Sequence, residues 1–95
     1  MRLSPEYVSV IKNSILEYIP EAEIFLYGSR TDDSKKGGDI DLLVKVQQEP
    51  ERIIKSQIKT QIFNKIGEQK IDIIYKCPEK NSSFIELIEL EAIPL

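Results

Sequence analysis

The run from Asp39 to Val44, Asp-Ile-Asp-Leu-Leu-Val, restricts the fold of this chain more than any other segment. In a strand, residues two apart point to the same face, with Cα atoms about 7 Å apart, so Asp39 and Asp41 project together. Strands disfavour aspartate, and two carboxylates this close repel each other unless a cation lies between them. The pattern fits a cation-binding strand, and for this pair alone it fits equally a solvated strand end. The opposite face carries only apolar side chains, those of Ile40, Leu42 and Val44.

Apolar spacing predicts two further strands and three helices around this run. The first helix begins at Pro5, with Ser4 as its N-cap, and Pro20 stops it. Its core face carries apolar residues three or four apart: Val8, Ile11, Ile15 and Ile19. The strands are expected over residues 23–27, 39–46 and 70–75.

A second helix is expected over about 51–66, with isoleucine at every fourth position of its buried face and Gly67 as its C-cap. Ser83 and Glu86 form a capping box, which predicts a last helix over about 83–91. The order of elements is helix, strand, strand, helix, strand, helix. It predicts an α+β (mixed α/β) fold, with a small three-stranded mixed β-sheet and packed helices.

Composition limits the classes of function. The net charge is −3, from 13 basic and 16 acidic residues, which argues against a long nucleic acid as partner because that needs a basic surface. One nucleoside triphosphate needs only a few local cations and metal ions. The single cysteine, Cys77, excludes an internal disulfide and fits a reducing cytoplasm. With neither a secretion signal at residues 1–5 nor a run long enough to span a membrane, we expect one soluble cytoplasmic domain over residues 1–95.

Three separate pieces of the sequence are expected to meet at one end of the sheet, where strands begin or stop. An antiparallel connection places Gly28, at the end of the first strand, beside Asp39, at the start of the second. A connection through a helix makes the second and third strands parallel, so both strands begin at that same end of the sheet. Asp41 and Asp72 both lie near these starts.

The turn Gly28-Ser29-Arg30 can hold phosphate oxygens through its backbone N–H groups, the Ser29 hydroxyl and the Arg30 guanidinium. Alone, each of the three pieces has an ordinary explanation as a turn or as exposed polar side chains. Together, three carboxylates beside such a turn predict a site for two magnesium ions and phosphoryl transfer.

These motifs resemble those of a known family. Gly28-Ser29-Arg30 followed by the run 39–44 is similar to the signature of the polymerase-beta-like nucleotidyltransferase superfamily. The length is similar to that of the minimal nucleotidyltransferases, which are often encoded with a HEPN-domain partner as toxin–antitoxin pairs. The resemblance extends to the strand 70–75 and to the last helix, and it implies the nucleotidyltransferase fold.

The resemblance also implies a role for each motif residue. Asp39 and Asp41 would bind both magnesium ions, and Asp72 would complete the catalytic metal site and help to deprotonate the acceptor hydroxyl. Ser29 would bind the terminal phosphates of ATP or another nucleoside triphosphate, and Arg30 would support phosphate binding.

Three functions are compatible with these features. The first is a Mg-dependent nucleotidyltransferase that moves AMP from ATP to a protein partner. Larger members of the superfamily bind the acceptor with an added domain, for which 95 residues leave no room, so we expect the acceptor surface to come from another chain. The resemblance implies a tyrosine of a HEPN toxin, a ribonuclease, with this chain as its antitoxin. The second is a non-catalytic antitoxin that silences a partner by contact, and the third is a transferase acting on a small molecule such as an antibiotic.

The last predicted helix motivates the second function. We expect it to contact a separate helical protein, with Ile85 and Leu90 as exposed apolar positions at which lysine would break the complex. The alternative is one core side with scattered exposed apolar surface, which is normal. The helix has more apolar residues than one narrow face requires: Phe84, Ile85, Leu87, Ile88 and Leu90.

Overall fold

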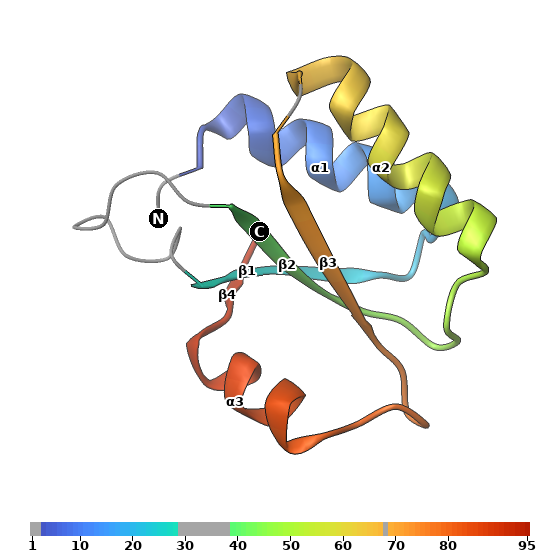
Figure 1. Ribbon diagram of the computed structural model, residues 1–95, viewed down its shortest axis with the longest axis vertical. Helices are drawn as coiled ribbons and strands as arrows, with labels where there is room; N and C mark the ends of the chain where they lie inside the picture. The colour runs from blue at the N-terminus through green and yellow to red at the C-terminus, as the bar shows by residue number, and fades with distance from the viewer. Residues whose placement is uncertain (1–2, 29–38, 68) are drawn as a thin grey trace.

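A computed structural model describes residues 3–28, 39–67 and 69–95 of the chain (Figure 1). The helices in this part are α1 (Pro5–Tyr18), α2 (Arg52–Ile66) and α3 (Ser83–Glu91). The strands are β1 (Glu23–Tyr27), β2 (Ile40–Lys45), β3 (Ile71–Lys76) and β4 (Ile93–Pro94). The α+β class is confirmed, and each predicted helix and strand lies close to its expected bounds. The short strand β4 was not predicted, so the mixed sheet has a fourth strand.

The sheet has the strand order β3-β2-β1-β4. As predicted, β1 pairs antiparallel with β2, and β2 pairs parallel with β3. The unpredicted β4 pairs antiparallel with β1, on the edge opposite to β3. Figure 1 shows α1 and α2 side by side over one face of the sheet, with α3 on the opposite face.

The larger part of the core lies between the sheet and the α1–α2 pair. Ile11 and Ile15 of α1 and Ile58 and Ile62 of α2 are fully buried there. They pack against the apolar face of β2 that the alternation of the run 39–44 predicted: Ile40, Leu42 and Val44.

The smaller part of the core lies under α3. Ile85 and Ile88 pack against Leu43 of β2, so the expectation that Ile85 is an exposed position is wrong. The sequence could not reveal this, because the five apolar residues of α3 allow more than one buried face. A stripe of three apolar residues faces solvent at three-residue spacing: Phe84 (60% exposed), Leu87 (64%) and Leu90 (85%).

Capping interactions fix the helix ends. The Ser4 hydroxyl accepts a hydrogen bond from the Tyr7 N–H at 3.2 Å, as expected of an N-cap. Gly67 caps α2 with a φ of 85°, and its N–H donates to the Phe63 carbonyl at 2.9 Å.

The predicted capping box of α3 is wrong by one residue. Ser82, not Ser83, is the N-cap, and its hydroxyl accepts from the Ile85 N–H at 3.2 Å. Glu86 instead accepts a hydrogen bond from the Asn81 amide at 3.4 Å. The two serines are adjacent, so their chemistry alone could not decide between them. In the described ranges, none of the helices has the length and apolar character needed to cross a membrane.

One buried polar side chain in α1 leads to a stability prediction. The Ser14 side chain is fully buried, and its hydroxyl has no hydrogen-bond partner among the described residues. Ser14→Ala removes an unsatisfied hydroxyl and improves helix propensity, so it should stabilise the fold by about 1 kcal/mol. Thermal unfolding should then occur roughly 4–8 °C higher. The exposed Ser9 of the same helix is the matched control, because Ser9→Ala changes propensity alone; equal gains in both variants would contradict the prediction.

Candidate active site

Three neighbouring strands bring their polar residues into one row. In the register of the sheet, Asp41 of β2 is paired with Tyr27 of β1 on one side and with Asp72 of β3 on the other. Neighbouring strands lie about 5 Å apart, so the two aspartates are side by side. Asp39 lies two residues before Asp41, and the Ile40 N–H donates to the Lys70 carbonyl at 3.0 Å, which holds the starts of β2 and β3 together.

This row lies on the face of the sheet that carries α3. The helix covers Leu43 and Ile74, which lie on the same face of the sheet, two residues after Asp41 and Asp72. It leaves Asp72 exposed and Asp41 partly exposed. The two carboxylates are therefore supported by a packed sheet and remain open to a ligand.

The electrostatic field at the row is negative. Burial raises the pKa of Asp41, and the negative charges of Asp72 and Asp39 raise it further, while Lys70 acts in the opposite direction. Burial and the same kind of repulsion, from Asp41, Asp72 and Glu91, raise the pKa of the Tyr27 hydroxyl to about 12. Adding a cation here would relieve the repulsion that raises both pKa values.

Gly28 lies against the Asp41 carboxylate. Its φ is +80°, a conformation that residues with a side chain rarely adopt. A Cβ at this position would lie 2.5 Å from Asp41 Oδ2. The structure thus brings together Gly28, Asp41 and Asp72, as the sequence predicted. Ser29 and Arg30 lie outside the described residues, so their phosphate-binding role stays a prediction.

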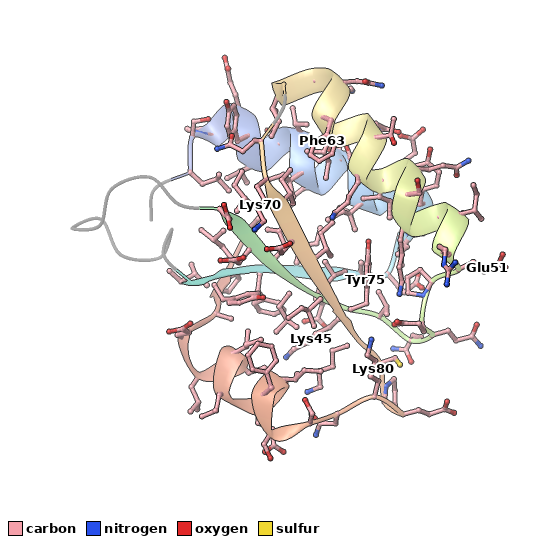
Figure 2. The ribbon with its side chains drawn as sticks, viewed as in Figure 1. Lys45, Glu51, Phe63, Lys70, Tyr75 and Lys80 are labelled. Atoms are coloured by element: carbon pink, nitrogen blue, oxygen red, sulfur yellow. The ribbon has the colours of Figure 1, made fainter. Side chains whose placement is uncertain are left out.

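The donor set fits a hard divalent cation such as magnesium, which prefers carboxylate oxygens. Asp39 and Asp41 precede and open β2 on one face, and Asp72 opens β3 beside them. Within the described ranges, however, no three Asp, Glu, His or Cys side chains already converge on one point. Asp39 is instead paired with Lys70, which Figure 2 labels. The Lys70 Nζ lies 3.4 Å from Asp39 Oδ2. A cation bound at Asp39 would compete with this ammonium group.

Sequence reasoning missed three residues near the carboxylates: Tyr27, Lys70 and Glu91. Lys70 stands two residues before Asp72, so the two-residue period of a strand could have placed it on the same face. Tyr27 directly precedes Gly28, and its pairing with Asp41 follows from the register. No local pattern in the sequence predicted that Glu91 lies near the carboxylates, because its position depends on how the chain leads from α3 back to β1.

The Lys70–Asp39 pair gives a second testable prediction. Removing the ammonium with Lys70→Gln should tighten the binding of Mn²⁺ or Mg²⁺ about threefold in the absence of nucleotide, because an exposed ion pair contributes at most about 1 kcal/mol. Isothermal titration or Mn²⁺-induced broadening of amide resonances would measure the change. Lys65→Gln, in the last turn of α2, removes the same charge away from the site. Equal affinity in the Lys70 variant and the wild type would show that the two cations do not compete.

Comparison with known proteins agrees with the geometry of the site. Residues 8–95 match the family described as the nucleotidyltransferase domain. No curated protein sequence matches the chain significantly. The family match covers nearly the whole chain and includes Gly28, Asp41 and Asp72. The chain therefore belongs to the nucleotidyltransferase domain family, as a minimal nucleotidyltransferase of the polymerase-beta-like superfamily, and its general activity is the transfer of a nucleoside monophosphate.

Proposed function

We propose that this protein is a Mg-dependent nucleotidyltransferase that transfers AMP from ATP to a hydroxyl group of a protein partner in the cytoplasm. The observation that carries the proposal is the pairing of Asp41 with Asp72 in adjacent parallel strands, next to Gly28, which lies against the Asp41 carboxylate. Family membership supports the reaction class. The negative charges of Asp72 and Asp39, which after burial contribute to the raised pKa of Asp41, support a cation at this point because it would relieve their repulsion.

The proposed reaction forms a bond between the acceptor oxygen and the α-phosphorus of ATP and breaks the bond from that phosphorus to pyrophosphate. Asp72 is exposed at the start of its strand, and it would accept the proton of the acceptor hydroxyl. Asp39 and Asp41 would hold the magnesium ions, and Gly28 lets the backbone approach the nucleotide. When bound, magnesium would supply positive charge beside the reacting phosphate.

The proposed acceptor is a tyrosine of a HEPN-domain toxin, with this chain acting as the antitoxin. This part of the proposal comes from the resemblance to minimal nucleotidyltransferases and from the exposed apolar stripe of α3, which suits a protein partner better than a small molecule.

Mass measurement can test the transfer directly. The protein is incubated with ATP, magnesium and the product of the neighbouring gene, and both proteins are then weighed intact. The expected result is a gain of one or more AMP units on the partner, absent with a chelator and absent with Asp72→Asn. An unmodified partner after incubation with the wild-type protein, under conditions where the two proteins bind, would overturn the proposed transfer.

A second candidate is neutralisation of the partner by contact alone. The exposed stripe of Phe84, Leu87 and Leu90 favours it, because an exposed apolar stripe on one helix suits a helical partner. The two candidates differ in one result. Asp41→Asn should leave a partner neutralised by contact fully inhibited, and should release a partner that is silenced by AMP transfer.

The stripe gives the third prediction. Leu87→Lys and Leu90→Lys should each weaken the complex with the partner at least tenfold while the isolated domain stays folded, since both side chains face solvent. Binding would be measured by titration calorimetry and folding by circular dichroism. Ile53→Lys is the matched control, because Ile53 is an exposed isoleucine on α2, away from the stripe. Wild-type affinity in both α3 variants would place the contact elsewhere.

A further inference from the structure

A concave site lies on the other side of the sheet from the carboxylates. It is a cavity of about 330 Å³ between α2 and β3. That volume is at the lower end of the range for small-molecule sites. Its walls combine three cations and a serine from the helix with an apolar floor from the strand: Arg52, Lys55, Ser56, Lys59, Ile73 and Tyr75.

Tyr75 supplies a polar group that lacks a partner. The residue is only 4% exposed, and Figure 2 shows it between β3 and α2. Its hydroxyl has no hydrogen-bond partner in the described part of the chain. Burial, and more weakly the charge of Glu49, raise the pKa of this hydroxyl to about 12, so it keeps its proton at neutral pH. A buried donor of this kind requires an acceptor, and an anion in the cavity would be one.

The charge pattern of α2 points to the same kind of ligand. Arg52, Lys55 and Lys59 are spaced three and four residues apart, which places them on one side of the helix. The N-cap of α2 is Glu51, but its first turn holds Arg52 and Lys55 and no acidic residue, although basic residues destabilise that end of a helix. Three positive charges at one cavity repel each other, and a bound anion would offset this repulsion.

Glu49 already neutralises part of this charge. Its carboxylate accepts hydrogen bonds from Lys55 Nζ at 2.7 Å and from Lys80 Nζ at 3.0 Å. Lys55 Nζ also lies 5.3 Å from the centre of the Tyr75 ring, which holds it at the cavity. Among the described residues, Arg52 and Lys59 form no ion pair, so two of the three cations remain available to a ligand.

We propose that this cavity binds the dianionic phosphate group of a small molecule, at a site separate from the three aspartates. Arg52, Lys55 and Lys59 supply the charge, and the hydroxyls of Ser56 and Tyr75 donate hydrogen bonds to the phosphate oxygens. The side chain of Ile73 and the ring of Tyr75 provide an apolar surface beside the phosphate. The same phosphate chemistry could come from free phosphate or from a nucleoside monophosphate, and the two are separable by experiment.

The test is a titration of the metal-free protein with inorganic phosphate and, separately, with AMP, followed by amide resonances. Saturable shifts at Ser56 and Tyr75 are expected, without matching shifts at Gly28 and Asp41. A higher affinity for AMP would identify a nucleotide as the source of the phosphate, and equal affinities would identify phosphate itself.

Variants make the test specific. Tyr75→Phe should weaken binding about tenfold, because it removes a hydrogen bond to a charged group. Lys59→Gln should weaken binding about threefold, whereas Lys65→Gln on the same helix should not change it. Glu49→Gln should tighten binding about threefold, because it releases Lys55.

Two results would overturn the proposal. One is a set of shifts that grow without saturation and spread over the exposed lysines. The other is equal affinity in the Lys59 and Lys65 variants together with unchanged affinity in Tyr75→Phe, whose fold is checked by its thermal unfolding in the absence of phosphate.

Discussion

Asp41→Asn and Asp72→Asn should each reduce the rate of nucleotide transfer by roughly a thousandfold or more. The change keeps the size of the side chain and replaces a charged oxygen donor by an amide. A metal ion contributes several kcal/mol to stabilising a phosphoryl-transfer transition state, and each 1.36 kcal/mol corresponds to about a factor of ten in rate. Transfer would be measured by release of pyrophosphate under saturating ATP and magnesium. Glu89→Gln is the control, because Glu89 is paired with Lys45 and Lys76 away from the row.

The same variants distinguish a functional from a structural role. The pKa of Asp41 is raised in the folded protein, so folding disfavours its charged form. This lowers the free energy of unfolding. The loss is complete at pH values above the raised pKa, and it disappears as the pH falls below the ordinary pKa of 3.8. In metal-free buffer at pH 7, Asp41→Asn should therefore melt at a higher temperature than the wild type, with the difference closing at acid pH. A large loss of stability would show that the aspartate supports the fold instead.

Gly28→Ala should both destabilise the fold and inactivate the site. Alanine at a φ of +80° costs about 1–2 kcal/mol, and the added Cβ would also lie 2.5 Å from Asp41 Oδ2. The Asp41 carboxylate or the Gly28 backbone must then move, and we expect transfer to fall at least tenfold, because small displacements of positioned groups have large effects on rate. Denaturant unfolding and the pyrophosphate assay measure the two effects.

Gly67 provides a matched control for this substitution. Its φ is +85°, and a Cβ there would have no atom within 4 Å. Gly67→Ala therefore also places an alanine at a positive φ, but without the contact to a carboxylate. The Gly67→Ala variant should lose stability only through the cost of its backbone conformation, and it should keep full activity. Equal activity in the two alanine variants would contradict the importance of the close approach between Gly28 and Asp41.

The elements of the fold were predictable because isoleucine marks their buried faces at regular spacing. The four-residue spacing in α2 and the alternation in β2 allowed little other than a helix and a half-buried strand. The connections then determined which pairs were parallel. Two features were not predictable for physical reasons. Ile93 and Pro94 are too few to show a period, and the serines at 82 and 83 offer the same capping chemistry.

The site was predictable to the extent that it depends on strand register. The neighbouring positions of Asp41 and Asp72 follow from a pair of parallel strands that start at the same level. The position of Gly28 follows from the antiparallel connection of β1 and β2. The Lys70–Asp39 ion pair depends on side-chain conformations that no spacing determines. The unpartnered Tyr75 hydroxyl is a property of the packed interface between β3 and α2, so only the three-dimensional structure reveals it.

The short strand β4 also affects how this protein behaves in solution. An unpaired strand edge can recruit the edge of another molecule and so begin aggregation. Ile93 and Pro94 pair with Leu26 and Phe25, which covers the outer edge of β1. Alternate residues of a strand direct their N–H groups to opposite sides, and the Leu95 N–H donates inward to the Ile24 carbonyl at 3.0 Å. Pro94 therefore occupies the outward position, where its nitrogen has no hydrogen to donate, and the sheet cannot readily be extended by a second molecule on this side.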